Sequence, residues 1–81
     1  MRMKYIRYES MGVVLFEGHI EHKTMNQLIN VTGEPVISAG FVSVHAVDDT
    51  LEVIASGDSV SLDAKSRPDD ADLIKRRIRL Y

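Results

Sequence analysis

Apolar and polar residues alternate along most of this chain, with a period that is typical of strands. Four runs rich in aromatic and β-branched residues, 3–8, 13–20, 36–47 and 51–62, predict four strands. Only a short polar segment at 48–50 separates the last two runs, which predicts a hairpin. We therefore expect a mostly antiparallel sheet, and the pattern leaves undecided whether that sheet is open or strongly curved.

The fourth run changes phase along its length. Val53 and Ala55 share one face of an extended chain, whereas Val60 and Leu62 have the opposite parity. A one-residue slip reverses the face, so both pairs point into a core only if the strand is bulged between them. Gly57 lies where that bulge is needed.

Apolar residues spaced three and four positions apart predict a short helix over about 24–30. Thr24 is a suitable N-cap, because its hydroxyl can accept a hydrogen bond from the first turn. Asn30 or Gly33 is a suitable end, because both residue types tolerate the conformation that stops a helix.

The C-terminal segment carries the clearest helix signal, over about 68–79. Pro68 suits a first helical turn, and Ser66 with Asp69 resembles a capping box in which Asp replaces Glu. Acidic residues lie at the start of this helix and basic residues at its end, as the helix dipole favours. The apolar stripe consists of Ala71, Ile74, Ile78 and Tyr81, widened by Leu73 and Leu80.

These elements define an α+β fold in a single domain that spans residues 1–81. About four strands form the sheet, with the short helix and the C-terminal helix packed on one face. One apolar face of the sheet then stays uncovered, so we expect self-association as a dimer or larger homo-oligomer. A chain of 81 residues also gains stability by burying more surface in this way.

The composition bounds the function only loosely. With 44% hydrophobic and 27% charged residues, the chain is expected to fold. A formal net charge of −2 argues against wholesale nucleic-acid binding, and the lack of cysteine excludes disulfides, thiol nucleophiles and thiolate metal sites. No segment is apolar enough for a signal peptide or a membrane helix, so we expect a cytoplasmic protein without membrane contact. Nothing in the sequence requires a cofactor.

Three ionisable residues near the end of the second predicted strand form a candidate metal site. Glu17, His19 and Glu21 alternate, so they project from one face of an extended chain. Imidazole and carboxylates on a common face can bind a divalent metal or act as acid and base. The other interpretation, which we favour, is the solvated face of an amphipathic strand.

A second candidate joins His45 with serines of the neighbouring hairpin arm. His45 beside Ser56 or Ser59 could activate a hydroxyl for hydrolysis. The nucleophile elbow G-x-S-x-G is absent, because Ser61 stands where its last glycine would be. Outward-facing serines more often hydrogen-bond only to water or to each other. A small hydrolase or metal-dependent enzyme using His19 or His45 is therefore the last alternative.

Basic residues occur at two places around the C-terminal helix. Lys65 and Arg67 precede its N-terminus, where free N–H groups attract anions, although an ion-pair corner with the acidic first turn explains them more simply. The candidate ligand-binding set is Ser59, Ser61, Lys65, Arg67 and His45. The candidate nucleic-acid set is Lys75, Arg76, Arg77 and Arg79. These four cations could contact a phosphate backbone, yet they also complement the helix dipole.

The segment around the predicted helix start resembles a pattern in short uncharacterised bacterial proteins, some from cyanobacteria and some on mobile gene elements. The residues that carry this resemblance are Gly57, Ser59, Ser61, Leu62, Ser66, Arg67, Pro68 and Asp69, with a looser echo at 14–17 and 38–41. The resemblance implies a bacterial, cytoplasmic origin, and it implies no catalytic residue.

The sequence favours a small oligomeric binding or interaction module without chemistry of its own. Besides the chain itself, it leaves open a protein or a small molecule as the partner. The first alternative is binding of nucleic acid or of a phosphate ligand through Lys65, Arg67 and the basic cluster at 75–79.

Overall fold

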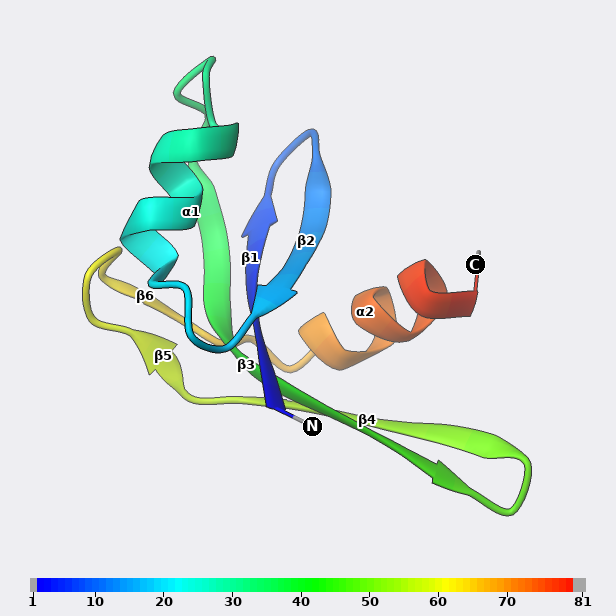
Figure 1. Cartoon of the computed structure of the whole chain (residues 1–81). Coiled ribbons are helices and arrows are strands. Elements are labelled where there is room, and N and C mark those ends of the chain that lie inside the picture. The colour runs from blue at the N-terminus through cyan, green and yellow to red at the C-terminus, as the bar shows by residue number, and fades with distance from the viewer. Residues whose placement is uncertain (1, 80–81) are drawn as a thin grey trace.

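Four strands form one antiparallel sheet in the computed structural model, which describes the backbone of residues 2–79 and the side chains of residues 2–78 (Figure 1). The strands are β1 (Arg2–Tyr8), β2 (Gly12–Glu17), β3 (Val36–Val47) and β4 (Thr50–Ser56), in the spatial order β2-β1-β3-β4. A separate ribbon pairs β5 (Asp58–Ser59) with β6 (Ala64–Lys65). The helices are α1 (His22–Ile29) and α2 (Asp70–Arg79). The expected α+β class, with a mostly antiparallel sheet of four strands, is confirmed.

Each face of the sheet carries its own apolar core. On one face, the fully buried Ile74 of α2 packs with a cluster of strand residues. The strand residues of that cluster are Tyr5, Val13 and Val42. The second core consists of Ile6, Tyr8, Phe16 and Ala39, and residues of α1 and of the β5–β6 ribbon pack against it. α2 therefore packs on one face as expected, α1 lies on the other, and an uncovered sheet face no longer argues for self-association.

The hairpin of β3 and β4 projects away from the rest of the molecule (Figure 1). Pairing continues outward until Val47 lies opposite Thr50, and Asp48 and Asp49 make the turn with φ of 47° and 66°. Positive φ at both central positions is typical of a type I′ turn, whose twist matches that of the flanking strands. The molecule is elongated, with extents of 40 × 22 × 21 Å.

The fourth predicted strand is shorter than the apolar pattern indicated. β4 ends at Ser56, and Gly57 has φ of 81°, so this glycine ends the strand where we expected a bulge. The chain then leaves the sheet and enters the β5–β6 ribbon, where Leu62 packs against the second core. Val60, which was expected to point into a core, is 89% exposed. Because the positive φ of Gly57 redirects the chain, the side chains after Gly57 do not continue the alternation between faces that holds along β4.

α1 begins two residues before its predicted N-cap. Glu21 is the N-cap, its side chain makes no capping hydrogen bond, and Thr24 lies within the helix. The expected end is confirmed, because Asn30 is the C-cap and its N–H donates to the carbonyl of Asn26. The side-chain oxygen of Asn26 accepts a hydrogen bond of 2.8 Å from the Tyr8 hydroxyl, which ties α1 to β1.

No helix in the described part of the chain is long and apolar enough to cross a membrane.

A buried carboxylate fixes the start of α2. Asp70 is fully buried, and both of its oxygens accept hydrogen bonds. The donors are the Tyr5 hydroxyl at 2.5 Å, the Ser38 hydroxyl at 2.8 Å, the Arg67 main-chain N–H at 2.8 Å and Nη1 of Arg7 at 3.1 Å. The amide of Asp70 donates in turn to the Arg67 carbonyl at 3.0 Å. The capping pair is therefore Arg67 with Asp70, one residue later than the predicted Ser66 with Asp69.

Burial and hydrogen bonding act in opposite directions on this carboxylate. Burial alone would raise the pKa of Asp70, but the hydrogen bonds it accepts, first that from Tyr5, hold the pKa below its ordinary value. Burial, together with the nearby carboxylate, raises the pKa of Tyr5, so the phenol stays protonated and donates. An ionised group therefore joins α2 to β1 and β3 inside the protein.

Candidate ligand pocket

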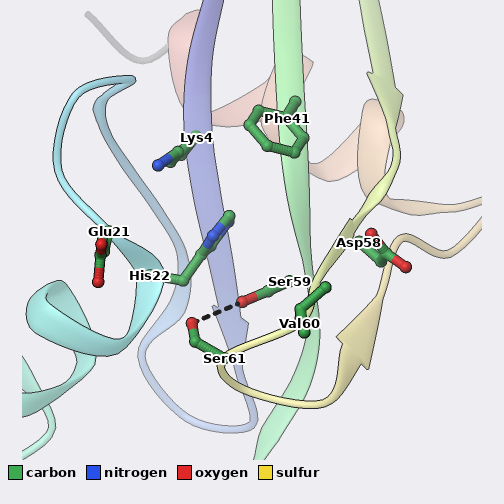
Figure 2. A pocket seen from close by; sticks show the side chains of 8 residues that line it. All are labelled: Lys4, Glu21, His22, Phe41, Asp58, Ser59, Val60 and Ser61. Carbon is green, nitrogen blue, oxygen red and sulfur yellow. Dashed lines mark hydrogen bonds between the residues drawn. The ribbon is translucent and has the colours of Figure 1, made fainter.

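An open pocket of about 460 Å³ lies where the start of α1 and the β5–β6 ribbon meet the sheet. Its lining residues are Lys4, Glu21, His22, Phe41, Asp58, Ser59, Val60 and Ser61 (Figure 2). These side chains come from β1, β3, the start of α1 and the ribbon. Segments that are far apart in the sequence therefore build the pocket together.

His22 forms one wall of this pocket. It is 4% exposed and stands edge-on between Phe16 and Phe41, with ring centroids 5.5 and 5.7 Å from its own. Its Nε2 lies 2.9 Å from the carbonyl oxygen of Gly40, to which the Nε2–H tautomer donates. Burial lowers the pKa of His22, and the hydrogen bond to Gly40 opposes that shift only in part. The neutral imidazole thus packs like a third aromatic ring.

This burial makes stability depend on pH. The folded chain holds a neutral His22, whereas the unfolded chain binds a proton near the ordinary pKa of 6.5. The unfolded state therefore carries more protons below that pH, and we expect the free energy of unfolding to fall as the pH drops from 6.5 towards the lowered folded pKa. Urea denaturation over this range measures the loss. His22→Gln should remove this part of the pH dependence, and His19→Gln, an exposed matched control, should retain it.

An NMR titration of the imidazole Hε1 resonances gives a direct readout that survives even if His22→Gln destabilises the fold. A His22 midpoint at or above 6.5 in the folded protein would contradict the buried, neutral imidazole.

Lys4 supplies the positive charge of the pocket. Its Nζ donates to the carbonyl of Ile20 at 2.9 Å and lies 5.9 Å from the centroid of Phe41. Arg2 covers the same ring, with its guanidinium carbon 4.1 Å from the centroid. Within residues 2–79 neither cation forms an ion pair. Two ammonium N–H bonds of Lys4 therefore stay available to a ligand.

Two serine hydroxyl groups line another part of the same pocket. Ser59 is 3% exposed, and its Oγ lies 3.4 Å from that of Ser61 and 3.3 Å from the amide nitrogen of Leu62. Both contacts are long for hydrogen bonds of a hydroxyl, so they hold it weakly. Figure 2 shows the two serine hydroxyls directed at each other, with Glu21 and Asp58 at opposite sides of the pocket.

Two of the five predicted ligand-binding residues reach this pocket, and three do not. Ser59 and Ser61 line it. Lys65 is exposed on β6 opposite Asp58, and His45 is exposed on the hairpin opposite Glu52. Arg67 is also exposed, and its main-chain N–H, not its guanidinium, binds a carboxylate. The guanidinium that pairs with the acidic helix start belongs to Arg7, at 3.0 Å from Asp69 and 3.1 Å from Asp70.

The candidate metal residues are separated by a turn. β2 ends at Glu17, and the amide of Ile20 donates back to its carbonyl at 3.1 Å, so the three residues do not share one strand face. Nδ1 of His19 lies 3.2 Å from the Glu17 carboxylate, while Glu21 is the N-cap of α1. Among the described residues, no three His, Asp or Glu side chains are placed to hold a metal ion.

The predicted hydroxyl–imidazole pair is not formed. His45 lies four residues further along β3 than Phe41, the partner of Ser56. In the described part of the chain, no serine hydroxyl is hydrogen-bonded to an imidazole. The histidine that the pocket contains is His22, whose role the sequence pattern did not indicate because the predicted helix began at Thr24.

The predicted nucleic-acid residues lie on α2, away from this pocket. Arg76 and Arg77 are exposed and Lys75 is half-buried, while the side chain of Arg79 lies outside the described residues. Arg77 lines a separate groove beside β2. Binding of nucleic acid by this cluster stays a prediction.

Comparison of the chain with models of protein families, with curated proteins and with solved structures finds no match in any of the three.

Proposed function

We infer that this chain is a small binding module whose pocket takes a small molecule through an anionic group, a phosphate or a carboxylate. The observation that carries this inference is that one pocket is lined both by Lys4, whose ammonium group has no ion-pair partner among the described residues, and by the weakly held hydroxyls of Ser59 and Ser61. Ammonium and hydroxyl groups donate hydrogen bonds, and an anion accepts them.

Two features of the surroundings favour the same ligand, although the carboxylates of Glu21 and Asp58 also line the pocket and oppose an anion. α1 starts at the pocket without a side-chain cap, so its first N–H groups add positive potential on that side. Phe41 and Val60 offer apolar surface beside the donors, which suits an organic body attached to the anionic group.

We propose binding without chemistry, because in the described part of the chain no base is hydrogen-bonded to the hydroxyls of Ser59 and Ser61. His22 is the only imidazole among the described lining residues, and its Nε2–H donates a hydrogen bond to the main-chain carbonyl of Gly40. Burial lowers the pKa of His22. An activated serine needs a general base within hydrogen-bond reach of its hydroxyl, and among the described residues Ser59 Oγ contacts only Ser61 Oγ and the Leu62 amide.

Thermal unfolding in the presence of inorganic phosphate, and separately of acetate, tests the proposal. A ligand at ten times its dissociation constant adds about 1.4 kcal/mol to the free energy of unfolding. For a domain of this size that should raise Tm by about 6–10 °C. Sodium chloride at equal ionic strength controls for screening, and the phosphate and acetate arms distinguish the two anion classes.

Variants locate the site. Lys4→Gln should abolish the rise in Tm and Ser59→Ala should reduce it, each measured against its own ligand-free Tm. Lys65→Gln removes a cation that does not line the pocket, and it should leave the rise unchanged. No rise with either anion, or an equal rise in Lys4→Gln, would show that the pocket is not the site.

A further inference from the structure

A second concave surface lies between the edge of the sheet and α2. Two adjoining cavities of about 300 and 190 Å³ share Val13 and Arg77 in their walls. The first also touches Val14 and Leu15 of β2, and the second touches Leu73 of α2. We call this surface, Gly12 to Leu15 with Leu73 and Arg77, the β2–α2 groove. It is apolar along its walls and has one guanidinium at its rim.

The rim cation has no counterion in the described chain. Arg77 is exposed and forms no ion pair within residues 2–79. β2 is an edge strand that pairs only with β1 in the sheet, so the groove is open on its outer side. An occupant should therefore present an apolar side chain next to a carboxylate.

The tip of the β3–β4 hairpin has that chemistry. Val47 is 45% exposed, and Asp48 and Asp49 follow it directly in the turn. Neither carboxylate forms an ion pair in the described part of the chain. The hydroxyl of Thr50 donates to the Val47 carbonyl at 2.6 Å, a contact that stabilises this conformation of the tip before it meets a partner.

We propose that the hairpin tip of one copy, Val47 to Thr50, docks in the β2–α2 groove of a second copy. Val47 packs against Val13 and Leu73, and the two turn carboxylates approach Arg77. The tip projects from its own body and makes no ion pair with its own Arg77, so the complementary surface is that of another molecule (Figure 1).

We expect the contact to be made once between two copies, tip to groove, so that the pair keeps one free tip and one free groove. Such a heterologous contact propagates into chains or closes into a ring. It also depends on exposed charges, which salt screens, so association should weaken as ionic strength rises. An isologous dimer would be closed and would not propagate, so growth beyond two chains distinguishes the two arrangements.

Complementation between two defective variants tests the geometry. Asp48→Asn with Asp49→Gly removes both tip charges and leaves a residue pair that type I′ turns favour, so the hairpin should still form. Arg77→Glu disables the groove at an exposed helix position. Arg76→Glu is the matched control, because this exposed arginine is adjacent on α2 and lines neither cavity.

Sedimentation velocity at low salt is the measurement. The native chain should show a mass that rises with concentration. The tip variant and Arg77→Glu should each lose association by at least about tenfold, whereas Arg76→Glu should lose much less. Mixing the tip variant with Arg77→Glu should give a species of two chains that grows no further. The intact tip of Arg77→Glu occupies the intact groove of the tip variant, and the other tip and groove are both disabled.

Three results would overturn the proposal. They are a native chain that stays monomeric at every concentration, a tip variant that associates as the native chain does, and a mixture that forms no complex. A tip variant that associates as the native chain does would place the contact on another surface. A mixture that forms no complex would exclude a contact between the tip of one copy and the groove of another.

Discussion

Asp70→Asn should lower the free energy of unfolding by about 3–5 kcal/mol, the cost of breaking a buried charge pair by removing one partner. The carboxylate is fully buried and accepts hydrogen bonds from Tyr5, Ser38 and the Arg67 main chain, and it pairs with Arg7. The amide has nearly the same shape, but its nitrogen faces donors and it carries no charge for the guanidinium. A chain of this size has about 4–12 kcal/mol of stability in total. Urea denaturation followed by far-UV circular dichroism measures the loss.

Asp69→Asn is the control for this loss. Its side chain is 61% exposed and also pairs with Arg7, at 3.0 Å. Exposed ion pairs contribute only about 0–1 kcal/mol, so this variant should be nearly neutral. Tyr5→Phe, which removes one donor to the charge, should cost about 1.5–3 kcal/mol. Equal effects of Asp69→Asn and Asp70→Asn would contradict a buried anchor for α2.

Gly40→Ala should cost about 2–3 kcal/mol through overpacking. A Cβ on Gly40 would lie 2.6 Å from the main-chain carbonyl oxygen of Ser56, and a main-chain atom cannot turn aside as a side chain can. The end of β4 must then move away from β3. Because the chain turns from that end into the ribbon, the pocket wall formed by Ser59 should move with it.

Gly18→Ala serves as the comparison for this variant. Its nearest atom, the Arg2 carbonyl oxygen, is 3.0 Å away, so a small shift accommodates the methyl group. We expect it to cost clearly less than Gly40→Ala in the same urea titration. A neutral Gly40→Ala would mean that β3 and β4 are less closely spaced at this point than the structure indicates.

The sheet could be predicted from the sequence because its signals are local. Alternation marked the strands, and the polar segment between β3 and β4 marked the hairpin. The β5–β6 ribbon could not be predicted, because the positive φ of Gly57 redirects the chain and no periodic signal records that change. The acidic start of α2 was visible, but not which acid is buried. That choice depends on Tyr5 and Ser38, 65 and 32 residues away from Asp70.

Only part of the candidate site could be predicted from the sequence, because the pocket is also built by contacts between segments far apart in the chain. Ser59 and Ser61 stood out because the apolar pattern did not explain them. Lys4 carried no signal, because it lies in the middle of an apolar strand and reaches the pocket only when β1 pairs with β3, opposite Phe41. His22 carried none either, since its aromatic neighbours Phe16 and Phe41 come from two other strands.

A titration of the ¹⁵N-labelled chain with inorganic phosphate, followed by amide chemical shifts, tests most directly whether the pocket binds an anion. Binding there predicts saturable shifts at Lys4, His22, Ser59 and Ser61. It also predicts no comparable shift at Arg76 and Arg77 on α2. Shifts confined to α2, or none in the pocket at saturating phosphate, would contradict the proposed function.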